Sequence, residues 1–110
     1  MRQKYIKYIP LLEKLNKANP KKRSKMLGDC SPEVVRLISE AVFNILKGNM
    51  KLTDHHYKKL SPYKRTLLFL AKKKKSLDAK RAHLKKGGAA ILPILLPAVI
   101  SLVSSLLNSR

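Results

Sequence analysis

The sequence predicts an all-α protein, and three observations support this prediction. Residues 31–48 carry apolar side chains at three- and four-residue spacing between a Ser-Pro start and a glycine stop. Helix-start signals recur at Thr53, Ser61–Pro62 and Ser76. No run of alternating residues of strand type appears. We therefore expect a small bundle of short helices with a basic helical extension and an apolar C-terminal helix.

Two short elements precede the strongest helix. Apolar residues from Ile9 to Leu15 predict the first, and the second spans Lys21 to Leu27 between Pro20 and Gly28. We expect both to pack against the helix of residues 31–48.

That helix has the clearest limits in the chain. Ser31 is a good N-cap, Pro32 suits the first helical position, and Gly48 can end the helix in the left-handed conformation. The apolar stripe between them is wide and almost uncharged, so we place it at the centre of the core; it comprises Val34, Val35, Leu37, Ile38, Ala41, Val42, Ile45 and Leu46.

Three further helices follow in the basic part of the chain. Thr53 precedes a short helix over 54–60, and Ser61–Pro62 opens another that runs through Ala71 into Lys75. Ser76 caps a last basic helix up to Lys86, where Gly87–Gly88 stops it.

Charge divides the chain into regions. It has 25 Lys and Arg against 6 Asp and Glu, a formal net charge of +19, yet 45% of its residues are hydrophobic. Self-repulsion of this size argues against an ordinary small enzyme and for a polyanionic partner. We predict a helical domain over 1–50, a Lys-rich nucleic-acid-binding region over 51–88 and an apolar tail over 89–110.

The basic region carries its charge in doublets and one quartet. Nineteen of the 25 basic residues are lysine, which neutralises phosphates without the bidentate fork that reads base edges. A solvated face or a nuclear import signal is the plainer interpretation of any single run. The predicted nucleic-acid-binding residues are Lys51, Lys58, Lys59, Lys64, Arg65, Lys72, Lys73, Lys74, Lys75, Lys80, Arg81, Lys85 and Lys86.

Catalytic and metal-binding patterns are missing from the sequence. His55 and His56 are adjacent, so they diverge on a helix, and Cys30 is the one cysteine. Carboxylates are few, and Gly87–Gly88 lacks the surroundings of a phosphate loop. We therefore predict no catalytic residue, no metal and no cofactor.

The N-terminus lacks the apolar core of a secretory signal, which favours maturation in the cytoplasm or nucleus.

The tail is uncharged from Ala89 to Ser109. Its second half has serines on one face and apolar residues on another, which suits a membrane surface or a protein partner. The alternative is that this helix completes the core of the protein itself. The predicted membrane- or partner-binding residues are Ile91, Leu92, Leu95, Leu96, Val99, Leu102, Val103 and Leu106.

The junction Lys85-Lys86-Gly87-Gly88-Ala89-Ala90-Ile91-Leu92-Pro93-Ile94-Leu95-Leu96-Pro97 resembles the adenoviral mu core protein precursor (protein X) family. The order of basic segment, Gly-Gly and apolar tail is also similar to that of X-like virion core proteins of Polinton/Maverick elements and adintoviruses. The resemblance covers about the last 60 residues. In the adenoviral family a viral protease cuts after the Gly-Gly and prefers an apolar residue four positions before the cut. Here that position is Lys85, and two alanines precede Ile91.

The resemblance implies a function and its partners. It implies a basic virion core protein that condenses packaged double-stranded DNA, present in the virion and in the host nucleus during assembly. It also implies cleavage by a viral cysteine protease at Gly87-Gly88-Ala89, after Gly88, and a tail that contacts capsid protein or a membrane.

Two other functions remain open from the sequence. One is a membrane-anchored or membrane-active viral peptide precursor, in which the polybasic segment binds anionic lipid. The other is a sequence-specific helical DNA-binding domain within residues 20–75, although no helix combines an apolar face with Arg, Asn or Gln placed for base edges.

Overall fold

The all-α prediction is confirmed. The computed structural model describes residues 3–48, 54–86 and 91–108, which form helices and no strand. Their Cα radius of gyration is 12.9 Å, as expected for one compact globule of this length. The elements in order are η1 (Gln3–Tyr8), α1 (Ile9–Lys17), α2 (Pro20–Asp29), α3 (Pro32–Leu46), α4 (Asp54–Leu60), η2 (Ser61–Tyr63), α5 (Lys64–Ala71), α6 (Leu77–Lys86) and α7 (Leu92–Asn108).

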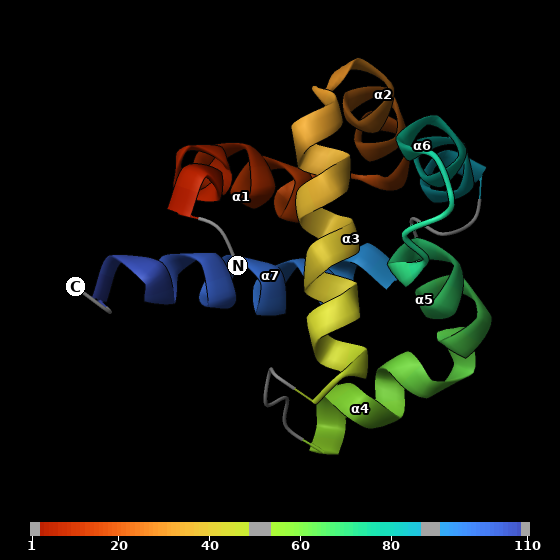
Figure 1. Cartoon of the computed structure of the whole chain (residues 1–110). Coiled ribbons are helices and arrows are strands. Elements are labelled where there is room, and N and C mark those ends of the chain that lie inside the picture. The colour runs from red at the N-terminus through yellow and green to blue at the C-terminus, as the bar shows by residue number, and fades with distance from the viewer. Residues whose placement is uncertain (1–2, 49–53, 87–90, 109–110) are drawn as a thin grey trace.

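Helix α3 runs through the middle of the molecule, with the other helices around it (Figure 1). It begins at Pro32, as predicted, and Gly48 beyond its end has a φ of 75°. Ser31 occupies the N-cap position with an extended backbone, but its side chain makes no capping hydrogen bond. Eight of the fifteen residues of α3 are buried, so the helix is the centre of the core.

Leu12, Leu15 and Leu27 share one core cluster with α3, as predicted, but α1 and α2 are not its main packing partners. Helix α3 packs mainly against α5 and α6, whereas α1 packs mainly against α7 and α2 against α6. The apolar face of α1, with Leu12 and Leu15, is covered by the uncharged α7. We expected the tail to lie outside the core and therefore paired α1 and α2 with α3. In the structure, α7 covers α1 and α6 covers α2 instead.

Several helix limits differ from the prediction. Asn19 caps α2, accepting a 2.8 Å hydrogen bond from the Lys22 amide, and this signal was missed. Helix α5 ends at Ala71 rather than running into Lys75, and Lys72 is extended (φ −68°, ψ 119°). Ser76 does cap α6, accepting from the Ala79 amide at 3.1 Å. The predicted cap Thr53 lies outside the described residues.

Helix α7 supplies a large part of the core. Its apolar side chains join those of α1, α3 and η1 in one cluster. Pro97 lies inside the helix with its ring exposed, and it has no N–H to donate to the carbonyl of Pro93 one turn earlier. Within the described part of the chain, no helix has both the length and the apolarity that crossing a bilayer requires.

Candidate nucleic-acid interface

Exposed lysines occur on η1, α1 and α2 as well as on α4, α5 and the connection 72–76, where eight exposed cations fall within 18 residues. We call this set the basic surface, and it consists of Lys58, Lys59, Lys64, Arg65, Lys72, Lys73, Lys74 and Lys75. These elements follow one another along the chain (Figure 1); α5 packs on α3 through Leu67 and Leu70, and α4 lies against α7 and η2. The doublets therefore lie on several short helices and a loop, not along one continuous helical face.

Two predicted DNA contacts point inward instead. Lys80 is 3% exposed, and its ammonium donates to Ser39 Oγ at 2.6 Å. The Arg81 guanidinium donates to the carbonyl oxygens of Leu27 at 2.8 Å and Cys30 at 2.6 Å. Lys80 is thus withdrawn from the surface, and Arg81 joins α6 to the end of α2.

The remaining predicted residues fall in two groups. Lys85 is exposed on α6, and its ammonium lies against Gly28 of α2, 3.2 Å from where a Cβ would stand. Lys51 and the predicted cleavage site Gly87-Gly88-Ala89 lie outside the described residues, as does the side chain of Lys86.

The two phenylalanines beside the basic surface contact cations of the protein itself. The Phe43 ring has the Lys73 ammonium 5.0 Å and the Lys47 ammonium 5.5 Å from its centroid. The Phe69 ring has the Lys75 ammonium 5.5 Å from its centroid, and it stacks on His83 with 4.6 Å between ring centroids. This arrangement favours contact with phosphates over stacking on bases.

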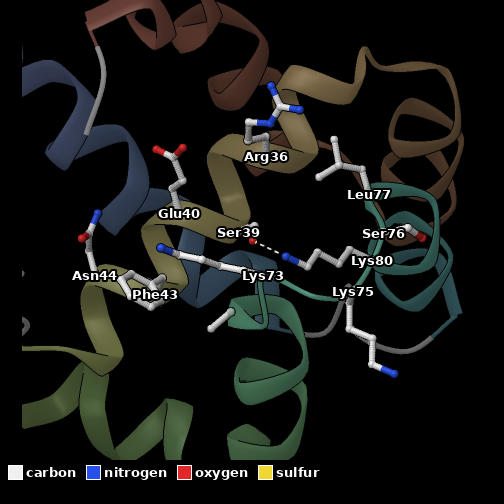
Figure 2. Close-up of a pocket in the computed structure, with 11 residues that line it drawn as sticks. Arg36, Ser39, Glu40, Phe43, Asn44, Lys73, Lys75, Ser76, Leu77 and Lys80 are labelled. Atoms are coloured by element: carbon white, nitrogen blue, oxygen red, sulfur yellow. Dashed lines mark hydrogen bonds between the residues drawn. The ribbon is translucent and has the colours of Figure 1, made fainter.

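A pocket of about 810 Å³ opens between α3 and the segment that joins α5 to α6 (Figure 2). Arg36, Ser39, Glu40, Phe43 and Asn44 line it from α3. The end of α5, the connection 72–76 and the first turn of α6 form the other wall. We call it the α3–α6 pocket.

Lys80 lies at the base of this pocket, and Lys73 reaches across it toward α3 (Figure 2). Burial lowers the pKa of Lys80, because the charged form loses solvation. Ser39 Oγ, which accepts from Lys80, donates to the Leu70 carbonyl at 2.6 Å. Arg36 and Lys75 also line the pocket, but their charged ends point away from Lys80 (Figure 2).

Sequence reasoning missed this pocket. One signal was present: Leu77 and Leu84 are one heptad apart, so the residues between them at Lys80–Arg81 share the inward face of α6. A second was Ser39, a polar residue within the apolar stripe of α3.

The tail residues with described side chains lie in the core. Ile91, Leu92, Leu95, Leu96, Val99 and Val103 are each 0% exposed. Their burial agrees with the alternative stated for the tail, in which its helix completes the core of the protein itself. The side chains of Leu102 and Leu106 are outside the described set.

Cys30 is half-buried, and its thiol donates to the Leu27 carbonyl at 3.2 Å. Burial raises its pKa, with the nearby Arg81 opposing that shift. Among the described residues, no three His, Cys, Asp or Glu side chains are grouped to hold a metal ion.

Comparison of the chain with protein-family models, with curated proteins and with solved structures finds no match.

Proposed function

We propose that this chain is a non-enzymatic virion core protein that binds packaged double-stranded DNA and condenses it by neutralising phosphates. The observation that carries the proposal is the basic surface, where eight cationic side chains are exposed on consecutive elements. Glu33 on α3 holds two of the other cations, Lys4 at 3.1 Å and Arg36 at 2.8 Å. These eight cations are part of the excess that gives the chain its net charge of +19.

The viral setting of the proposal rests on the resemblance at residues 85–97. A virion core protein would act in the particle and in the host nucleus during assembly. Packaged duplexes repel one another, and neutralising their phosphates lets them approach.

The experiment is the salt dependence of binding of the full chain to random double-stranded DNA. The basic-surface variant replaces Lys72, Lys73, Lys74 and Lys75 by Gln. The charge-matched control replaces four exposed lysines of α1 and α2, namely Lys14, Lys17, Lys21 and Lys22. We expect the log–log slope of affinity against salt to fall by about 0.9 for each phosphate that the chain no longer neutralises, so by roughly 3 to 4 in the first variant. In the control the slope should fall by less than about 1.

Each outcome bears on a different part of the proposal. Equal decreases in slope for the two variants would contradict the assignment of the basic surface, while leaving phosphate neutralisation intact. Binding to DNA that does not depend on salt, or bound DNA that only one competitor sequence can displace, would contradict the proposed function itself. Light scattering from long duplex DNA then tests condensation, which we expect as chain charge approaches phosphate charge.

Burial of α7 affects the alternatives that concern the tail. A membrane-anchored precursor would have to withdraw six fully buried side chains from the core before α7 met lipid. Cleavage after Gly88 stays a proposal, as does a capsid partner. If the bond is cut, the same burial would hold α7 in place without a covalent link.

A further inference from the structure

We propose that the α3–α6 pocket binds the phosphate group of a small organic phosphate, with the Lys80 ammonium at its base and Lys73 at its mouth. The proposal does not depend on DNA condensation, because it concerns a concave site and one compact ligand rather than the exposed basic surface.

The first argument is the incomplete pairing of Lys80. An ammonium has three N–H donors, and Ser39 Oγ accepts one of them at 2.6 Å. Within the described part of the chain, Lys80 forms no salt bridge with a carboxylate. A cation that is 97% buried is costly without a counter-charge, and an anion in the pocket would supply it.

The second argument is the charge of the lining. Four cations line the pocket beside the carboxylate of Glu40. Arg36 is paired with Glu33 and the charged end of Lys75 points away, so Lys73 and Lys80 are the cations that face the pocket. A concave surface with this excess concentrates anions, and lysine is a common phosphate binder. Phosphate has enough acceptor oxygens for the remaining donors of Lys80 and for Lys73.

The third argument is size. About 810 Å³ lies within the ~300–1,000 Å³ typical of small-molecule sites and far exceeds a bare phosphate ion. Phe43 and Asn44 line the part of the pocket nearest the Lys73 ammonium, where an organic group attached to the phosphate would lie.

The test is calorimetric titration of the full chain with adenosine 5′-monophosphate at low salt, with adenosine as the phosphate-free control. The variants are Lys80→Met, Lys73→Gln and Lys74→Gln. Lys74 is the matched control, because it is exposed in the same lysine run but does not line the pocket. We expect saturable binding of the nucleotide alone, weakened about tenfold or more by Lys80→Met and Lys73→Gln and less than about twofold by Lys74→Gln.

Equal weakening by the Lys73 and Lys74 variants, equal binding of adenosine, or no saturable nucleotide binding would overturn the proposal. If Lys80→Met fails to fold, the comparison of the Lys73 and Lys74 variants decides alone.

A second titration uses a DNA duplex that carries 5′-phosphates and one that lacks them. It distinguishes a small organic phosphate from a nucleic-acid end as the source of the bound phosphate group. Tighter binding of the phosphorylated duplex in a Lys73-dependent, Lys74-independent manner would support the site with a nucleic-acid end as its ligand. Binding of the unphosphorylated duplex reports on the proposed function, independently of the pocket.

Discussion

Arg23, Arg81 and Lys80 each bring a cation to the C-terminal end of another helix. Arg23 donates to the carbonyls of Leu15 at 2.9 Å and Ala18 at 2.8 Å, at the end of α1. Arg81 does the same for α2, and Lys80 reaches the end of α5 through Ser39. The last carbonyls of a helix lack partners within it and carry a partial negative charge, so a cation there stabilises the junction.

Arg23→Ala should lower the free energy of unfolding by about 2 kcal/mol, because it leaves buried carbonyls of α1 without their charged donor. Lys25→Ala, on an exposed position of the same helix, should change it by less than about 0.5 kcal/mol. Urea unfolding followed by circular dichroism measures both, and similar values for the two would contradict the capping role.

Lys80 should make stability depend on alkaline pH. Burial lowers its pKa from the ordinary 10.5, so between the folded value and 10.5 the unfolded chain binds more protons than the folded chain. The free energy of unfolding contributed by Lys80 therefore rises with pH across that interval. Cys30 has the opposite sign above pH 9.0, because burial raises its pKa.

The measurement is urea unfolding of the wild-type chain and of Lys80→Met at several pH values. Cys30 is present in both chains, so its effect cancels in the difference. We expect the stability of the wild type relative to the variant to increase toward pH 10.5. A pH-independent difference would mean that the Lys80 ammonium is as well solvated as a surface lysine.

The inward position of Lys80 and Arg81 also shows where prediction at the residue scale failed. In the sequence they form one more basic doublet, identical in composition to Lys64–Arg65. Their direction follows from the helix that carries them, since Leu77 and Leu84 fix which side of α6 faces α2 and α3. Ser39 was equally hidden, because its partners lie 31 and 41 residues away.

At the scale of elements, α3 was predictable and its neighbours were not. Local signals, Pro32 at the start and Gly48 after the end, define α3 without reference to the rest of the chain. Which helix covers α1 depends on tertiary packing, so α7 was assigned to a separate tail. The absence of charge from α7 was the usable signal, since a helix of that kind is well suited to a core.

A chain ending at Gly88 should not fold. It lacks six fully buried side chains, Ile91 and five of α7, which removes on the order of 10 kcal/mol of burial, comparable with the whole stability of a small domain. Adding residues 89–110 as a separate chain should restore the helical signal in circular dichroism. The Leu96→Asp form should fail to restore it, whereas Ser101→Asp, at an exposed position, should succeed. A folded 1–88 chain would contradict this account and the placing of α7 in the core.

At the scale of the whole molecule, the net charge of +19 opposes the compact state. Added NaCl should therefore raise the melting temperature by several degrees between roughly 20 and 300 mM, because screening weakens repulsion. The variant with Gln at positions 72–75 should start from a higher melting temperature and respond less. An unchanged melting temperature would indicate that the exposed lysines are too far apart to repel appreciably.

The helical class and the excess of charge were both readable from the sequence. Composition and periodicity determine them, and neither depends on how the helices are arranged. The α3–α6 pocket could not be read in this way, because it exists only where α3 meets the connection between α5 and α6.

The pairing of α1 with α7 has a consequence for how the chain is made. It joins an early helix to the last described one, so most of the chain must be synthesised before α7 can pack on the apolar face of α1. Closing so long a loop is slow compared with local helix pairing. During translation the apolar face of α1 therefore remains unprotected beside newly made lysines, and folding is completed only after the ribosome has produced α7.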